Sequence, residues 1–309
     1  MEGGARADIR RLAAGTILRN LKTLAARIPA ARARRGTEPV HDLRVASRRI
    51  RAALRLLDRT VAASGARDTK RRRRWRRELK RVTRALGAAR DTDVQLECVR
   101  EFLQKAGRRP HLRPGVERLL LRLRQRRGVE QRDLVVALDR LERSGALREM
   151  RREFRKTRAE AERRQPAESA TREVVRRLDR MLAYERFLTR PERQKELHEM
   201  RIAAKRFRYT MEALSPLFAG GLDAWIRAAR KVQADLGDIH DCDVWISQTL
   251  PEFLAGERAS AELKPGIAAV LRDRRNRRRA AYRAFIRLWK KLRREKTWDQ
   301  LKKALREAR

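Results

Sequence analysis

The sequence predicts an all-α protein built from two similar helical bundles. Ala, Leu, Arg and Glu dominate its 309 residues, aromatic residues make up only 5%, and there are just 15 glycines and 9 prolines. Such a composition favours helices, because sheets would need more β-branched residues. Two sequence blocks recur at offsets of 157 and 150 residues, and their apolar residues alternate spacings of three and four, as on one face of a helix.

The first half, residues 5–143, shows this pattern from its beginning. Thr37 is the expected N-cap of the second helix, and Gly87 is expected to end the third. Helices are expected over residues 9–28, 40–61 and 75–86, then from near residue 91, and from residue 114 onward.

The second half, residues 170–295, repeats this order, with Gly237 in the place of Gly87 and Pro265-Gly266 in the place of Pro114-Gly115. Residues 144–169 between the halves are expected to form a partly helical connector. Residues 296–309 are expected to form a C-terminal helical tail. We expect residues 1–309 to form a single domain in which the bundles pack about a pseudo-twofold axis around a basic central groove.

The first repeated block carries a histidine and many cations. Residues 41–54 read HDLRVASRRIRAAL, and residues 198–211 read HEMRIAAKRFRYTM. In both, cations follow the apolar positions by one residue, so each helix has a basic stripe beside its core stripe, where Ser47 is the one polar member. These cations repel one another, which predicts an anion against them. The stripes comprise His41, Arg44, Arg48, Arg51 and Arg55, and His198, Arg201, Lys205 and Arg208, with Arg49 and Arg206 widening them.

The second repeated block carries a pair of aspartates. It reads LGAARDTDV over residues 86–94 and LGDIHDCDV over residues 236–244. Because each pair is expected where a helix begins, one carboxylate would cap free amides and the other would pair with an arginine, with Mg²⁺ binding as the alternative. The aspartates are Asp91, Asp93, Asp241 and Asp243. Further candidate phosphate contacts are Lys80, Arg230, Arg122, Arg127, Arg272 and Arg277.

The net charge indicates a polyanionic partner. The chain has 82 Lys and Arg against 40 Asp and Glu, for a formal charge of +42. Most of the cations are arginines, which fits bidentate phosphate recognition or simply a GC-rich genome. The longest uncharged run, residues 213–222, is too short to cross a bilayer, so we expect a cytoplasmic protein without membrane contact.

Catalytic and metal-binding motifs are missing from the sequence. It has no Walker A loop, no GxSxG and no HExxH, which predicts a protein that is not an enzyme, with phosphohistidine chemistry at His41 or His198 as the remaining catalytic alternative. The segment from His240 to Asp243 has metal-ligand character, but its repeat partner has neither His nor Cys, so we predict no metal and no cofactor. A second alternative is sequence-independent RNA or DNA binding, although the stripes lack the aromatic residues that stack on bases.

The duplicated His-x-x-Arg-(Val/Ile)-x-x-(Arg/Lys)-Arg-x-Arg and Leu-Gly-x-x-x-Asp-x-Asp-Val blocks resemble the CHAD family, the conserved histidine α-helical domain, over essentially the whole chain. The resemblance implies two four-helix bundles around a basic groove that binds inorganic polyphosphate, and association with polyphosphate granules in bacteria. Some relatives carry an N-terminal triphosphatase domain, but no motif of that domain is seen here, which favours a stand-alone module. Arg90 stands where the second half has His240, so the resemblance assigns no role there.

Overall fold

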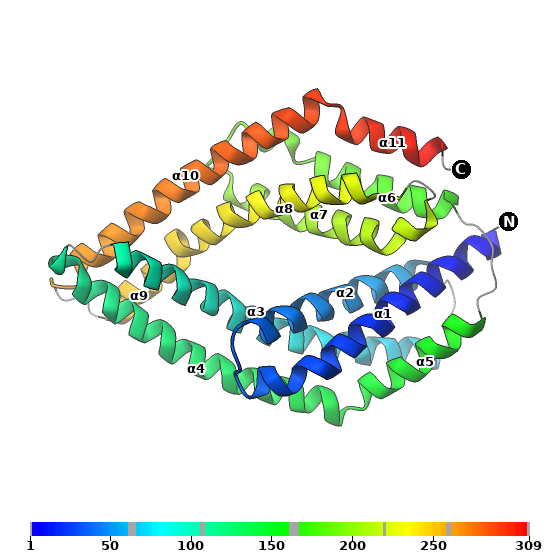
Figure 1. Ribbon diagram of the computed structural model, residues 1–309, viewed down its shortest axis with the longest axis horizontal. Coiled ribbons are helices and arrows are strands. Elements are labelled where there is room, and N and C mark those ends of the chain that lie inside the picture. Colours follow the sequence, from blue (N-terminus) through cyan, green and yellow to red (C-terminus); the bar gives the residue numbers. More distant parts are fainter. Residues whose placement is uncertain are drawn as a thin grey trace. The chain divides into compact units, whose positions relative to one another are not determined.

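The computed structural model describes residues 2–60, 66–105, 109–160, 167–218, 221–257 and 261–307. Helices joined by short turns make up these ranges, with no β-strand among them, which confirms the all-α prediction (Figure 1). The chain divides into two compact units. Unit 1 comprises Met1–Glu97 and Leu123–Ala170, and unit 2 comprises Cys98–Arg122 and Thr171–Arg309.

Two long helices cross the boundary between the units in sequence. They are α3 (Ala66–Lys105) and α4 (Arg113–Arg143), because residues 98–122 belong to unit 2. The expected helix break at Gly87 was wrong: α3 continues through it, and α8 (Asp223–Val244) likewise continues through Gly237. A glycine inside a helix costs only about 0.5–1 kcal/mol, which the packing of its neighbours offsets.

The core of unit 1 lies between α1 (Glu2–Arg32), α2 (Glu38–Thr60), the first part of α3, the second part of α4 and α5 (Ala146–Glu160). Ser47 is fully buried in this core, as the apolar spacing predicted, and its hydroxyl donates to the Arg44 carbonyl at 3.1 Å. Phe154 of α5 packs on Trp75, with ring centroids 5.9 Å apart. Much of the predicted connector is therefore a core helix, while its residues 161–166 lie outside the described ranges. Residues 61–65, which include the last residue of the second predicted helix, also lie outside them.

Unit 2 is built around α7 (Gln194–Leu214), α8 and α10 (Lys264–Arg294). Trp298 of the predicted tail is buried against Phe207, with ring centroids 5.7 Å apart, so the tail also belongs to a core. The α-helices of unit 2 are α6 (Ala167–Leu182), α7 (Gln194–Leu214), α8, α9 (Leu250–Gly256), α10 (Lys264–Arg294) and α11 (Thr297–Glu307). Short helical turns occupy Pro110–Leu112, Glu185–Phe187, Ser215–Leu217 and, in π form, Trp245–Thr249.

The helices α5 and α11 occupy matching places in the sequence repeat. Gly145 and Lys296, which are 151 residues apart, precede them with φ of 69° and 52°. Pro114-Gly115 and Pro265-Gly266 have the same offset. The predicted connector and tail therefore contain helices that follow a left-handed residue at the same sequence offset, a relation that the sequence reasoning missed.

Two glycines make a reciprocal close contact within unit 2. A Cβ atom on Gly115 would lie 2.2 Å from the Leu263 carbonyl oxygen, and one on Gly266 would lie 2.2 Å from the Leu112 carbonyl oxygen. No side chain fits at these distances, so the start of α4 and the start of α10 meet backbone to backbone. The duplicated Pro-Gly motif marks this contact.

Candidate functional site

The basic stripe of α2 lies beside the buried face of that helix. Val40 and Leu43 are fully buried, whereas His41 is exposed and Arg44 and Arg48 are half-buried. Burial also lowers the pKa of the Arg51 guanidinium. The helical spacing of three and four residues thus places the charges along one edge of the core. Arg55, the last member of the stripe, is exposed.

The histidine of this stripe sits in a positive field. Partial burial of its ring lowers the pKa of His41, and the neighbouring charges of Arg90 and Arg44 lower it further. Arg44 Nη1 lies 2.9 Å from Asp91 Oδ1, and the Asp91 side chain is 69% exposed. Because α3 runs without a break past this residue, Asp91 caps no helix and pairs with an arginine instead.

The stripe of α7 contains a pair of histidines. His198 Nδ1 lies 3.0 Å from His240 Nδ1 of α8, so one imidazole donates and the other accepts, according to tautomer. Burial lowers the pKa of His240 to about 3, with further lowering by Arg201, His198 and Lys205. Burial and the charge of Arg201 also lower the pKa of His198. The free protein therefore holds an uncharged histidine pair among cations near neutral pH.

His240 had no predicted role. The repeat could have pointed to it, because it places His240 where the first half has Arg90. Arg90 lowers the pKa of His41, and His240 forms a hydrogen bond with His198.

Arg206 and Arg49 lie to one side of the stripes on their helices. At 100° per residue, Arg206 lies about 80° from His198 and about 140° from Arg201 around the helix axis, and the same steps separate Arg49 from His41 and Arg44. Arg206 also lines a cavity of about 340 Å³, together with Arg177, Arg180, Arg186 and Glu199 among others.

Arg208 is held by its own unit. Its side chain is buried; Nε donates to Gln233 Oε1 at 3.0 Å, and Nη1 donates to Glu212 Oε1 at 2.6 Å. The guanidinium also lies over the Tyr209 ring, 4.4 Å from its centroid. These contacts fix Arg208 at the inner edge of the stripe and occupy part of its donor set.

The second aspartate of each pair binds an arginine of a long helix. Arg127 Nε donates to Asp93 Oδ1 at 2.7 Å, and only 1% of the Arg127 side chain is exposed. Arg127 is therefore inaccessible to a ligand in this structure, which corrects its assignment as a phosphate contact. In unit 2, Arg278 Nε donates to Asp243 Oδ1 at 2.5 Å. Arg278, not Arg277, is thus the counterpart of Arg127, at the same offset of 151 residues as the Pro-Gly motifs.

These arginines belong to networks that position the stripe helices. Arg127 Nη1 donates to Gln131 Oε1, and Gln131 Nε2 donates to the Ala31 carbonyl at 2.9 Å, at the end of α1. In unit 2, the Tyr282 hydroxyl donates to the Leu188 carbonyl at 2.5 Å, and Arg278 donates to the Pro191 carbonyl at 2.7 Å.

Both networks bind the backbone just ahead of a histidine-bearing helix. Gln131, Arg278 and Tyr282 were not predicted. Extending the offset of 151 residues along the long helices would have paired Gln131 with Tyr282.

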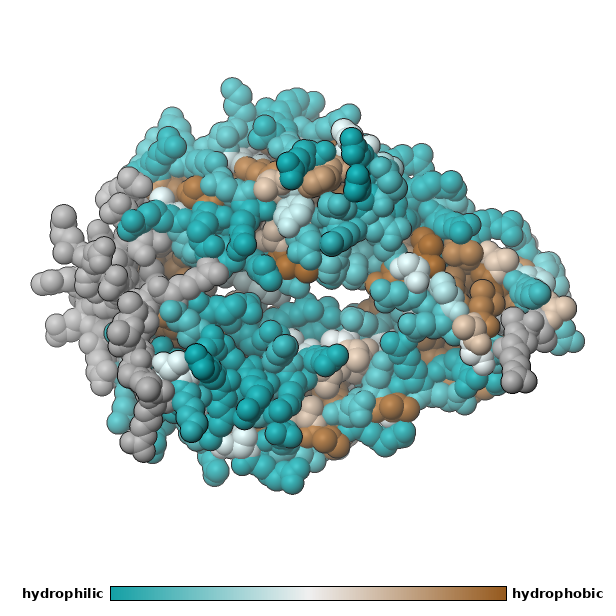
Figure 2. All heavy atoms as spheres, turned by 180° about the vertical axis from the view of Figure 1, so that it is seen from behind, coloured by the Kyte–Doolittle hydropathy of each residue, from teal (hydrophilic) through white to brown (hydrophobic). Residues whose placement is uncertain are grey.

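The remaining candidates are scattered over the surface. Arg122 pairs with Glu257, and Arg277 Nε lies 3.4 Å from Asp273 Oδ2. Figure 2 shows that hydrophilic residues predominate on the face it displays. The other exposed candidates are Lys80, Arg230, Asp241 and Arg272.

Neither a metal centre nor a membrane span is found in the part of the chain that the structure describes. No three His, Cys, Asp or Glu side chains gather there as metal ligands would, and none of its helices has the length and hydrophobicity to cross a bilayer.

The comparisons with known proteins agree with this fold. The structure is similar to the CHAD domain from the plant Ricinus communis, with a TM-score of 0.66 and 20% identity, over 89% of this chain and 92% of that one. It is also similar to PptA from Streptomyces chartreusis, with a TM-score of 0.62 and 17% identity, over 91% of this chain and 99% of that one. No curated protein matches the sequence. Residues 15–250 match the family described as the CHAD domain, and the chain therefore belongs to the CHAD family.

Proposed function

We propose that this protein binds inorganic polyphosphate through the basic stripes of α2 and α7 and does not act on it chemically. One observation carries the proposal: in each unit the pKa of the stripe histidine is lowered chiefly by burial and further by neighbouring cations, including members of the stripe. A polyanion would relieve this repulsion, because phosphates beside the cations favour the protonated imidazole. Membership of the CHAD family supports the same ligand.

The residue types suit a phosphate chain. Arginine donates two parallel hydrogen bonds to phosphate oxygens, lysine adds a mobile charge, and histidine adds a donor once it is protonated. A ligand without sequence needs no base-reading side chains. The described stripe residues include no Phe, Tyr or Trp, and Trp75 and Trp298 are fully buried, which favours polyphosphate over single-stranded nucleic acid.

Competition binding tests the proposal. Long-chain polyphosphate, single-stranded RNA and duplex DNA, matched for phosphate, compete for the protein in an anisotropy assay at physiological salt. We expect polyphosphate to win by about a hundredfold, which corresponds to about 2.7 kcal/mol. Equal competition by the three polymers would instead identify a generic basic surface.

Matched variants locate the site. Reversing Arg44 and Arg201 to Glu should abolish tight binding. Reversing Arg132 and Arg287, which are exposed on α4 and α10, changes the net charge equally and should have little effect. Equal losses in both variants would eliminate the stripes as the site. The shared groove expected from the sequence predicts one long chain bound per protein, whereas separate stripes predict two.

The enzymatic alternative has its own readout. Polyphosphate incubated with the protein should keep its length and release no phosphate, and no phosphohistidine should form at His41 or His198. In bacteria, a fluorescent fusion should collect on polyphosphate granules and disperse in the Arg44→Glu, Arg201→Glu variant.

A further inference from the structure

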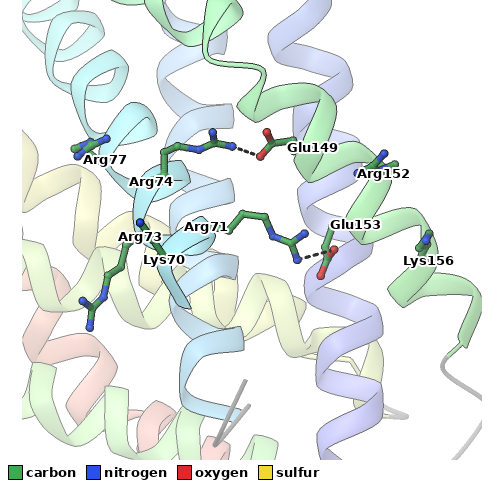
Figure 3. A pocket seen from close by; sticks show the side chains of 9 residues that line it. All are labelled: Lys70, Arg71, Arg73, Arg74, Arg77, Glu149, Arg152, Glu153 and Lys156. Carbon is green, nitrogen blue, oxygen red and sulfur yellow. Dashed lines mark hydrogen bonds and ion pairs between the residues drawn. The ribbon is translucent and has the colours of Figure 1, made fainter. Parts of the chain in front are cut away.

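Unit 1 contains a second concentration of positive charge, which none of the α2 stripe residues lines. A cavity of about 980 Å³ lies between the beginning of α3 and α5 (Figure 3). Seven cations and two carboxylates line it, and no aromatic side chain is among them. The lining residues are Lys70, Arg71, Arg73, Arg74, Arg77, Glu149, Arg152, Glu153 and Lys156.

The two carboxylates are already engaged. Arg71 Nη2 lies 2.9 Å from Glu153 Oε2, and Arg74 pairs with Glu149, as Figure 3 shows. Hydrogen bonding from Arg74 lowers the pKa of Glu149, which also accepts a bond from Trp75 Nε1 at 2.9 Å. These pairs join α3 to α5 and hold two guanidinium groups in fixed positions within the cavity.

Five cations remain in excess over the carboxylates. The side chains of all five are exposed: Lys70, Arg73, Arg77, Arg152 and Lys156. In addition, Arg74 Nε is buried and, within the described residues, has no hydrogen-bond partner. A polar atom in that state is costly, and so is like charge gathered in a concave site, where field lines are focused.

The sequence repeat provides an internal comparison. The Trp75–Trp225 register places Gly220 opposite Lys70, Asp223 opposite Arg73 and Ala224 opposite Arg74.

The residues of α11, at the place of α5 in the repeat, also differ from those that line the cavity. Gln300, Ala304 and Glu307 stand where α5 has Glu149, Glu153 and Lys156, at the offset of 151 residues. The second repeat keeps two of these cations, as Arg227 opposite Arg77 and Lys303 opposite Arg152. It lacks the other cations of the cavity and both of their carboxylate partners, so helices at these places in the repeat do not require the full cluster.

We propose that the α3–α5 cavity is a second anion site, which takes a compact molecule carrying several clustered phosphate groups. Its volume is in the range of small-molecule sites. Cations without aromatic rings select phosphate groups over a nucleobase. The site goes beyond polyphosphate binding by the stripes and does not depend on it.

Small probes in a stripe-deficient background isolate this site. Inositol hexakisphosphate, tripolyphosphate and orthophosphate are titrated by calorimetry into the full chain carrying Arg44→Glu and Arg201→Glu. We expect the first two to bind and orthophosphate to bind far more weakly. A preference for inositol hexakisphosphate would indicate a cyclic ligand, and a preference for tripolyphosphate would indicate a linear one. Binding lost in the stripe variant but present in the unaltered protein would overturn the second site and leave the stripe proposal intact.

Two triple variants with equal charge loss complete the test. Replacing Arg73, Arg152 and Lys156 by Gln should weaken probe binding roughly tenfold or more, since a hydrogen bond to a charged group is commonly worth that much. Replacing the exposed Arg132, Arg151 and Arg155, which do not line the cavity, should change it by less than about threefold. Equal losses would overturn the proposal.

Hydrogen exchange supplies a readout that needs no variant. Bound probe should protect amides in residues 70–77 and 146–156. Protection confined to α2 and α7 would contradict the second site.

Discussion

The buried pair of Asp93 and Arg127 gives the sharpest test of how the stripes are positioned. Replacing Asp93 by Asn removes the charge that balances a guanidinium with 1% exposure, while the Asp93 side chain itself is 7% exposed. Leaving one partner of a buried ion pair uncompensated typically costs about 3–5 kcal/mol. Asp91, two residues away on the same helix, pairs with Arg44 in solvent, where such pairs contribute about 0–1 kcal/mol.

We therefore expect Asp93→Asn to lower the free energy of unfolding by about 3 kcal/mol. Asp91→Asn, as the matched control, should lower it by less than about 1 kcal/mol. Guanidinium unfolding followed by far-UV circular dichroism measures both, with hydrogen exchange used to assign the loss to unit 1. Equal destabilisation by the two variants would refute the reasoning.

A double replacement separates the pair's net contribution from the cost of breaking it. Asp93→Leu together with Arg127→Met removes both charges, and such apolar replacements of buried pairs are often neutral. Most of the stability lost in Asp93→Asn should then return. If the double variant is less stable to unfolding than Asp93→Asn, the pair contributes to stability mainly through the hydrogen bonds to Gln131 and the α1 carbonyls.

Three further predictions follow from the same geometry. The pKa values of His198 and His240 are lowered in the free protein, and bound phosphate raises them, so binding takes up protons. Polyphosphate affinity should therefore increase as the pH falls below about 6.5. An affinity that does not change with pH would contradict this. Gly266→Ala should destabilise unit 2 severely through its clash with a carbonyl, whereas Gly87→Ala, with open space around it, should stabilise the chain by about 0.5–1 kcal/mol in thermal melts. Trp298→Ala should cost about 3–5 kcal/mol, and a cost below about 1 kcal/mol would show that α11 is dispensable.

Much of the local structure followed from the sequence alone. The spacing of apolar residues placed Ser47 in a core, and the repeat identified both histidine-bearing helices. Periodicity is informative there because each helix buries one face, so every third or fourth residue reports its environment.

The rest depended on packing that periodicity does not record. Gly87 and Gly237 read as helix ends, since propensity is a local quantity, yet tertiary contacts carry both helices through them. Arg127 was predicted to contact phosphate, because the sequence does not show whether an arginine will pair with a buried carboxylate. The α3–α5 cavity was also missed, since its cations come from helices that are about 75 residues apart.

The membership of residues 98–122 in unit 2 has a consequence for synthesis. Leu112, Val116 and Leu119 are buried there, and the start of α4 contacts Gly266 of α10. The ribosome makes this segment well before its partner. At about 5–20 residues per second, the wait lasts roughly 7–30 s. During that time an apolar helix start is exposed on the nascent chain, so a stall between the two Pro-Gly motifs would leave an aggregation-prone intermediate that chaperones must cover.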